Sequence, residues 1–269
     1  MSDVLLTILI YFPLIMYHLT PSPARIESFL VPFMDGSRRI TVYLPRGYDT
    51  SELDYPTLYM PDGQVYVGEV PADFIVVGVD SEWQERWDSL SPWVQWQMPL
   101  WFGISSPRGG RGDEYLTSLL DVKDIIDERY RTKTTREYTA IGGCSMGGFF
   151  AIYAGLERPD IFSKVVAFSP AVWFGSRNIN QWLTQNNLID FIYRLDDVDF
   201  WIYQGGNESH DAGYPKTGLD FPTVYTQGAT KAHELLGGEF LFNRYGQHSS
   251  VVFLCYFDEA FAWLDTKWQ

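Results

Sequence analysis

The distribution of apolar residues divides this chain into short runs and longer periodic segments that alternate along most of its length. The short runs are rich in β-branched and aromatic residues and are bounded by Gly, Pro or Asp, which is typical of β-strands. The predicted strands lie at residues 25–32, 38–44, 56–60, 73–79, 138–142, 164–168, 199–203 and 239–245.

Segments with apolar residues at helical spacing follow several of these strands. In the clearest of them, residues 115–130, Leu116, Leu119, Val122 and Ile126 recur every three or four positions. Further helices are predicted from residue 149 onward and at residues 178–193, 223–236 and 251–268. Strands that alternate with helices predict an α/β fold with a mostly parallel central sheet and helices on both faces.

Asp35-Gly36 joins the first two strands and is a hairpin turn signal, so it predicts an antiparallel N-terminal edge of the sheet. Residues 24–269 are expected to form one domain, since α/β folds of this length are often single units. Residues 81–113 show no clear period and hold five of the ten tryptophans. We interpret them as a Trp-rich loop insertion, and loops of this length are uncommon unless they are functional.

Residues 1–23 are expected to be an apolar leader or an appended segment. Residues 4–17 are almost wholly apolar, but Pro13 interrupts them and no Lys or Arg precedes them, unlike in a secretory signal. The run is short for a membrane span, so no stable span is expected. We predict a cytoplasmic protein. A secreted or surface-anchored protein, held through this apolar N-terminus, is the alternative.

The chain has 269 residues and a formal net charge of −14. This charge argues against nucleic acid as a partner, because there is no basic surplus to neutralise phosphates. Two cysteines, Cys144 and Cys255, are too few for a disulfide framework and are expected to be reduced. The sequence leaves both a monomer and a homodimer open.

Gly143-Cys144-Ser145-Met146-Gly147 lies between a predicted buried strand and a predicted helix. The G-x-S-x-G nucleophile elbow requires this context, because its tight turn exposes the serine hydroxyl above the sheet. Small residues around the serine let the strand and the helix approach closely. We therefore interpret Ser145 as a nucleophile. The alternative is a glycine-rich turn with a buried serine.

A serine nucleophile needs a base within hydrogen-bond reach and an acid that orients this base. In hydrolases with this elbow the acid follows the serine along the chain and the histidine comes last. His248 lies in a turn between the last predicted strand and the last predicted helix, and we interpret it as the base. Glu208, which follows the strand at 199–203, is the first choice for the acid, and Asp211 is the second.

An oxyanion hole needs preorganised N–H donors. We expect one donor to be the backbone N–H of Met146, directly after the nucleophile. The loop that follows the strand at 56–60 is expected to supply the other, from Gly63 or Gln64. The chemistry that these residues predict needs no cofactor, and no metal site is predicted.

Six motifs carry a resemblance to a known family: Val42-Tyr43-Leu44-Pro45, Asp62-Gly63-Gln64, Gly143-Cys144-Ser145-Met146-Gly147-Gly148, Phe168-Ser169-Pro170, Gly205-Gly206-Asn207-Glu208 and Gly246-Gln247-His248-Ser249. With them the chain resembles the esterase D / enterochelin-esterase-like branch of the α/β-hydrolases, which also includes feruloyl esterases and mycolyltransferases. The resemblance runs from about residue 40 to the C-terminus and implies an α/β-hydrolase fold and serine ester hydrolysis. Residues 121–126 depart from the Glu-Leu-Ile-Pro run that is common in the family.

The predicted substrate is a neutral aromatic (feruloyl-like) or short acyl ester. Tryptophans of the insertion would form an apolar wall over Ser145, although each could instead only pack the loop. The residues expected to line the pocket are Trp83, Trp87, Trp93, Trp96, Trp101 and Arg86. Arginines in the same segment could meet an anionic group, so a catecholate siderophore ester is an alternative. An acyltransferase and a non-catalytic binding protein on a hydrolase fold are further alternatives.

Overall fold

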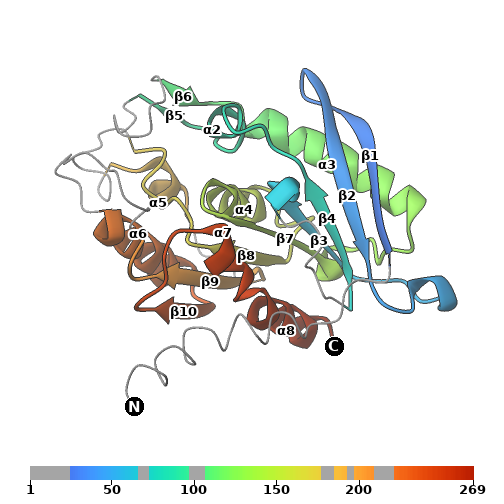
Figure 1. Cartoon of the computed structure of the whole chain (residues 1–269). Helices are drawn as coiled ribbons and strands as arrows, with labels where there is room; N and C mark the ends of the chain where they lie inside the picture. Colours follow the sequence, from blue (N-terminus) through green and yellow to red (C-terminus); the bar gives the residue numbers. More distant parts are fainter. Residues whose placement is uncertain (1–24, 66–72, 97–106, 177–184, 193–196, 209–220) are drawn as a thin grey trace, which may run out of the picture.

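The computed structural model describes residues 25–65, 73–96, 107–176, 185–192, 197–208 and 221–269. At its centre is one eight-stranded sheet with the strand order β1-β2-β4-β3-β7-β8-β9-β10 (Figure 1). Its strands are β1 (Arg25–Phe33), β2 (Gly36–Leu44), β3 (Thr57–Pro61), β4 (Ile75–Val79), β7 (Thr139–Cys144), β8 (Lys164–Phe168), β9 (Asp199–Gly205) and β10 (Glu239–Asn243).

The six strands from β4 to β10 along the sheet pair in parallel. By contrast, β2 is antiparallel to both of its neighbours, β1 and β4. The register of the β1–β2 hairpin places Phe33 opposite Gly36, so the turn lies at Met34 and Asp35. The prediction of a mostly parallel sheet with an antiparallel N-terminal edge is therefore confirmed.

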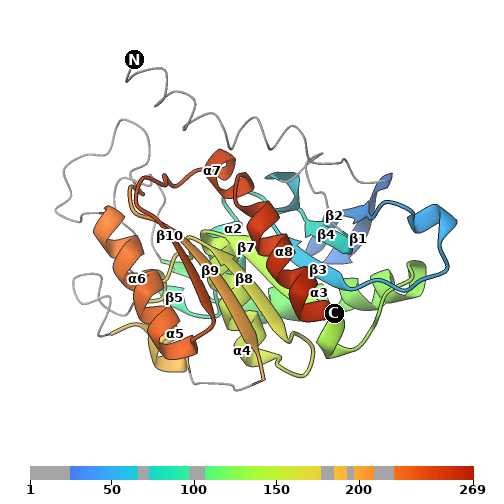
Figure 2. The same cartoon turned by 90° about the horizontal axis from the view of Figure 1, so that it is seen from below.

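Helices cover both faces of the sheet (Figure 2). On one face, α3 (Gly112–Arg129), α4 (Met146–Glu157) and α6 (Phe221–Leu236) share a hydrophobic core with the strands. On the other face, α7 (Ser250–Leu254) and α8 (Phe257–Trp268) form a second core. Because both faces are buried, strands such as β4 are apolar at nearly every position instead of alternating.

The segment at 81–113 contains more regular structure than the predicted loop. Its described part includes α2 (Arg86–Ser89) and an antiparallel ribbon of β5 (Val94–Gln95) and β6 (Arg108–Gly109). Asp88 of α2 accepts hydrogen bonds from the Gly109 N–H at 3.0 Å and the Arg108 guanidinium at 2.7 Å, which fasten the ribbon to the helix. Elements this short leave no periodic pattern in the sequence.

The single closing helix predicted at 251–268 is wrong, because the chain breaks between α7 and α8. Tyr256 leaves the helical region with φ −111° and ψ 7°. Its ring stacks on Tyr203 at 4.4 Å between centroids, and its hydroxyl accepts a 2.8 Å hydrogen bond from Asn243. These tertiary contacts hold the break. Of the helix predicted at 178–193, only α5 (Asn187–Phe191) lies in the described residues.

The loops after β3, β7, β9 and β10 all leave the sheet at the carboxyl ends of parallel strands, which lie along one edge. They carry Gly63, Ser145, Glu208 and His248 in turn. Within the described residues, we find no helix with the length and apolar character that a membrane crossing needs.

Candidate active site

Ser145 forms the sharp turn between β7 and α4. Its φ of 58° and ψ of −116° are rarely adopted by residues other than glycine, and such strain costs about 1–3 kcal/mol. Backbone hydrogen bonds hold the turn nonetheless. The Ser145 N–H donates to the carbonyl of Phe168 at 2.8 Å. The Ser145 carbonyl accepts from the N–H groups of Phe149 at 2.9 Å and Ala171 at 3.0 Å.

Two glycines make this turn sterically feasible. A Cβ at Gly143 would lie 2.5 Å from the carbonyl carbon of Gly147, so the strand and the helix can approach only without it. A Cβ at Gly147 would lie 3.2 Å from the ring of Pro61 and 3.3 Å from Oδ2 of Asp62. The elbow is therefore in close contact with the turn that follows β3.

His248 lies in the turn between β10 and α7. Its Nε2 is 2.9 Å from Oγ of Ser145, so the serine hydroxyl can donate a hydrogen bond to the imidazole. The imidazole centroid lies 4.5 Å from that of Tyr225 and 5.3 Å from that of Phe253, which meets it edge-on. Since packing on two sides restricts rotation of the ring, Nε2 stays directed at Ser145.

Glu208, after β9, extends this chain of contacts to the far side of the imidazole. The residue is fully buried, and its Oε2 is hydrogen-bonded to Nδ1 of His248. Its Oε1 accepts three further hydrogen bonds, from the Ser169 hydroxyl at 2.6 Å, the Gly205 N–H at 3.0 Å and the Gln204 amide at 3.1 Å. These donors compensate for the loss of water around the carboxylate.

The structure thus brings together three residues that the sequence singled out for one site: Ser145, His248 and Glu208. Asp211, the second choice for the acid, lies outside the described residues. The four hydrogen bonds of Glu208 described above are all made with protein groups, so they hold its carboxylate in one orientation.

The turn after β3 lies beside the elbow. Asp62 adopts a left-handed backbone with φ 61°, and Gly63–Val65 form a short 3-10 turn. Gly63 packs directly on β4, since a Cβ there would lie 2.5 Å from the carbonyl carbon of Gly78. Met146, the other predicted donor, is the first residue of α4, where N–H groups have no acceptor within the helix.

A pocket of about 300 Å³ opens over Ser145. Its wall combines the candidate catalytic residues with apolar and aromatic side chains. The lining residues are Asp62, Gln64, Val65, Trp83, Arg86, Trp87, Cys144, Ser145, Tyr225, His248, Ser249, Ser250 and Phe253. A concave, mainly apolar site with few polar groups suits a small organic ligand.

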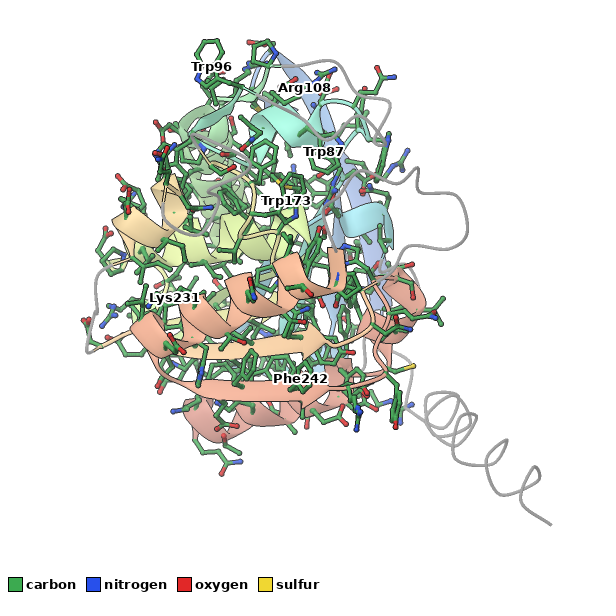
Figure 3. The ribbon with its side chains drawn as sticks, turned by 90° about the vertical axis from the view of Figure 1, so that its left-hand side faces the viewer. Trp87, Trp96, Arg108, Trp173, Lys231 and Phe242 are labelled. Carbon is green, nitrogen blue, oxygen red and sulfur yellow. The ribbon has the colours of Figure 1, made fainter. Side chains whose placement is uncertain are left out.

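The tryptophans of the 81–113 segment fall into different environments. Trp83 and Trp87 line the pocket and meet edge-on at 6.2 Å. Trp93 differs from the expectation: it is partly buried against the core, with its ring centroid 6.1 Å from that of Phe149, and is not part of the pocket lining. Trp96 also lies outside the lining and is 66% exposed, at the periphery of the molecule (Figure 3). Trp101 lies outside the described residues.

The differing environments follow from the fold of the segment. Trp83 lies just before α2 and Trp87 lies within it, next to the turn after β3. Trp93 and Trp96 instead flank β5 and do not line the pocket. Trp87 is buried and stands near Trp173 at 6.3 Å, in the interior of the molecule (Figure 3).

Tyr225, on α6, is a pocket residue that the sequence did not indicate. Its side chain is buried beside His248, and it lines the pocket together with Ser145. Burial raises the pKa of the phenol above its ordinary value, and interactions with Trp173 and Ser145 only partly oppose that shift. Tyr225 is therefore neutral and able to donate. The sequence does not identify Tyr225 as a pocket residue, because its position beside Ser145 depends on how α6 packs.

Across the described part of the chain, no three His, Cys, Asp or Glu residues are grouped as metal ligands. Cys144 and Cys255 form no disulfide with each other.

Comparison with known proteins places this site in a family context. The family described as "Putative esterase" matches residues 32–264. Among curated proteins, the uncharacterized protein YbbA of Bacillus subtilis is 25% identical over 152 residues, which is 52% of this chain and 59% of that protein. A siderophore enterobactin esterase of Emericella nidulans is 32% identical over 71 residues, 26% of this chain and 23% of that protein. The matches thus span less than two thirds of either relative.

Solved structures share the fold. An IroE-like serine hydrolase from Shewanella oneidensis superposes with a TM-score of 0.66 at 18% identity, over 90% of this chain and 80% of that one. A ferulic acid esterase superposes with a TM-score of 0.62 at 18% identity, over 92% of this chain and 100% of that one. The family match covers most of the sequence and includes the elbow, the histidine turn and Glu208, so the chain belongs to the putative esterase family.

Proposed function

We propose that this protein is a serine ester hydrolase in which Ser145, His248 and Glu208 form a catalytic triad. The observation that carries the proposal is the unbroken chain of contacts from Oγ of Ser145 through both ring nitrogens of His248 to the buried Glu208. The elbow backbone of Ser145 and the family membership support it.

In the first half of the reaction, Oγ of Ser145 attacks the ester carbonyl carbon while Nε2 of His248 takes the hydroxyl proton. The resulting tetrahedral intermediate collapses, and the imidazolium gives its proton to the leaving alcohol oxygen. Glu208 holds the imidazole through Nδ1 and stabilises its positive charge. The products of this half are a free alcohol and an acyl group on Ser145.

In the second half, water replaces the alcohol. Nε2 of His248 takes a proton from water as its oxygen attacks the acyl carbon, and the proton then returns to Oγ of Ser145 as the acid leaves. The N–H groups of Met146 and of Gly63 or Gln64 are the proposed donors to the oxyanion in both halves. These steps use no metal and no organic cofactor.

The proposed substrate is a neutral ester with an aromatic (feruloyl-like) or short acyl group. Trp83, Trp87, Tyr225 and Phe253 supply flat apolar surface in the pocket, which suits a ring or a small alkyl chain. A pocket of about 300 Å³ is of the size that accommodates such a small molecule. The ferulic acid esterase among the structural neighbours is consistent with an aromatic acid.

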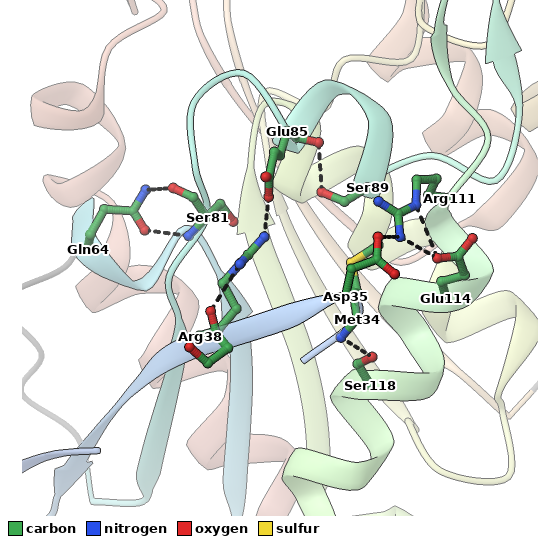
Figure 4. Close-up of polar contacts among 11 residues, drawn as sticks. Met34, Asp35, Arg38, Gln64, Ser81, Glu85, Ser89, Arg111, Glu114 and Ser118 are labelled. Carbon is green, nitrogen blue, oxygen red and sulfur yellow. Dashed lines mark hydrogen bonds and ion pairs between the residues drawn. The ribbon is translucent and has the colours of Figure 1, made fainter. Parts of the chain in front are cut away.

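A catecholate siderophore ester is the second candidate, supported by the match to a siderophore enterobactin esterase. The ion pairing of the nearby arginines argues against this candidate. The three arginines of the 81–113 segment are all in ion pairs. Arg86 pairs with Asp62, and Arg108 pairs with Asp88. Arg111 pairs with Asp35 and Glu114 (Figure 4). A polyanionic substrate would have to compete with these carboxylates for each guanidinium.

We also propose that the protein acts on a small-molecule ester in the cytoplasm, which fits two cysteines that form no disulfide with one another. Light scattering on the purified protein would distinguish a monomer from a homodimer.

Hydrolysis of a panel of esters by wild type and Ser145→Ala tests the function. The panel contains p-nitrophenyl acetate, butyrate and octanoate, methyl ferulate and a catecholate siderophore ester. We expect turnover of methyl ferulate or a short acyl ester, and its loss in Ser145→Ala. A strong preference for the siderophore ester would replace the first substrate candidate by the second.

Other outcomes overturn more of the proposal. Activity that survives in Ser145→Ala would exclude Ser145 as the nucleophile. Transfer of the acyl group to an added alcohol in preference to water would indicate an acyltransferase. A wild type that turns over no ester of the panel but binds one of them would favour a binding protein on this fold.

A further inference from the structure

The turn that carries the proposed oxyanion donors Gly63 and Gln64 is held from outside by the start of the Trp-rich segment. The Gln64 amide donates to the Ser81 carbonyl at 2.8 Å, and its oxygen accepts from the Ser81 N–H at 2.9 Å (Figure 4). The Asp62 N–H also donates to the hydroxyl of Ser81, at 3.2 Å. These bonds close the base of the turn.

Arg86 of α2 adds a bidentate ion pair to this arrangement. Its Nε lies 3.0 Å from Oδ1 of Asp62, and its Nη2 lies 2.6 Å from Oδ2. Arg86 is 7% exposed and Asp62 is 4% exposed, so little water competes for either group. Two parallel bonds between planar groups fix the orientation of both, which a single bond would not do.

Asp62 is the residue of the turn whose conformation matters most. Its φ of 61° reverses the chain between the end of β3 and Gly63. Its Oδ2 also packs against Gly147 of the elbow, where an added Cβ would be only 3.3 Å away. Movement of the Asp62 side chain would therefore shift the turn relative to Ser145.

Arg86 is held on its other sides by aromatic rings. Its guanidinium carbon lies 5.7 Å from the ring centroid of Trp83 and 5.9 Å from that of Trp87. Cation–π contacts of this kind stabilise a guanidinium that has left water. Arg86 is thus built into the pocket wall, with its fork directed at a carboxylate of the protein.

From this geometry we propose that Arg86 is a positioning residue: through its bidentate pair with Asp62, it holds the turn of Gly63 and Gln64 in the conformation that presents the oxyanion donors to Ser145. The inference rests on the proposed ester hydrolase function for its catalytic part. It assigns to the Trp-rich segment a part in catalysis in addition to substrate contact.

The kinetic test compares Arg86→Ala with Arg108→Ala on p-nitrophenyl acetate, a substrate small enough to make few contacts with the pocket wall. Arg108 is a matched control because it also pairs with an aspartate, Asp88, in the same segment but outside the pocket lining. We expect kcat to fall on the order of 100-fold in Arg86→Ala, as on loss of an oxyanion donor, with KM changed less than about threefold. Arg108→Ala should stay within about twofold of wild type.

Two further variants separate positioning from folding. Arg86→Lys keeps the charge but cannot form the planar fork, so we expect partial recovery of kcat. The double variant Arg86→Met with Asp62→Asn leaves no unpaired buried charge, and asparagine tolerates the left-handed backbone. We expect it to fold and still to show the low kcat.

Hydrogen–deuterium exchange of the full chain gives a readout that is independent of turnover. The amides of Gly63 and Gln64 should exchange faster in Arg86→Ala, and in the double variant, than in wild type or Arg108→Ala. Unchanged exchange at these amides would overturn the inference, and so would a kcat equal to that of Arg108→Ala. If wild type hydrolyses no ester, the proposed function fails, while the exchange data still decide whether Arg86 holds the turn.

Discussion

The hydroxyl of Ser169 donates a 2.6 Å hydrogen bond to Oε1 of Glu208, and both residues are completely buried. Ser169 directly follows β8 and has a φ of 41°, a left-handed conformation for a non-glycine residue. Its N–H is bonded to the carbonyl of Tyr203 at 2.7 Å. Ser169, just after β8, thus fixes the carboxylate of Glu208, which follows β9. Oε2 of Glu208 remains available for His248.

Ser169→Ala should lower both stability and kcat. Removal of one donor from a buried carboxylate costs about 1–3 kcal/mol, and kcat should fall about tenfold because Glu208 holds His248 less firmly. Ser163→Ala is the matched control. Ser163 precedes the same strand, is also buried, and donates a 2.7 Å hydrogen bond to the Arg136 carbonyl at the opposite edge of the sheet. It should lose stability but keep kcat, and an equal kcat loss in both variants would argue against this role of Ser169.

Glu208→Gln should reduce kcat by on the order of 10³-fold with little change in KM, because the neutral amide cannot stabilise the imidazolium. Asp211→Asn should leave kcat within about twofold of wild type if Glu208 is the acid. Steady-state kinetics of the two variants on the same ester decide between these carboxylates. A large loss in Asp211→Asn alone would reverse the assignment.

Tyr225→Phe removes the hydroxyl that interacts with Ser145 but keeps the ring that packs on His248. We expect kcat to fall about 3- to 10-fold, the equivalent of one hydrogen bond. Tyr245→Phe, at a tyrosine that is 79% exposed, should have no effect. If Tyr225→Phe matches wild type, the hydroxyl has no part in the reaction.

Trp83→Ala should raise the KM for methyl ferulate by about 5- to 10-fold, because an aromatic wall of the pocket is lost. The KM for p-nitrophenyl acetate should change less. Trp96 offers a close control, since it is 66% exposed against 65% for Trp83 but does not line the pocket. Equal effects of Trp83→Ala and Trp96→Ala would show that the change does not arise from substrate contact.

Ionisation of Asp265 in α8 makes the stability of the protein depend on pH. Partial burial, and secondarily the charge of Asp73, raise its pKa to about 6. Since the ordinary value is lower, the folded protein binds more protons than the unfolded chain between about pH 4 and 6, and this group's contribution to stability is lost as pH rises through that window. Asp265→Asn should therefore raise Tm at pH 7.5 by about 2 °C, after allowance for solvent screening, and have no effect near pH 4. Thermal unfolding at both pH values checks this, and an equal shift at both would contradict it.

Much of the fold was predictable from local sequence. The strand of residues 164–168 was predicted with the bounds of β8, and most other strands were predicted within two residues, because buried parallel strands form continuous apolar runs. The elbow residues and the chain order of nucleophile, acid and histidine could also be predicted. Each of these motifs lies directly after a strand, and parallel strands bring such positions to one edge of the sheet.

Tertiary structure decided what local patterns do not encode. The break at Tyr256 depends on Tyr203 and Asn243, which belong to other strands. Which tryptophans reach the pocket depends on the path of the short elements between β4 and α3, and so does the pairing of Arg86 with Asp62. Tyr225 lines the pocket with Ser145 only because α6 packs on the sheet beside β9. The sequence by itself thus determined the strands, the family and the candidate triad residues, since these follow from contiguous patterns. Pocket shape, charge pairing and the placement of Tyr225 are set by contacts between distant segments, which only the folded chain defines.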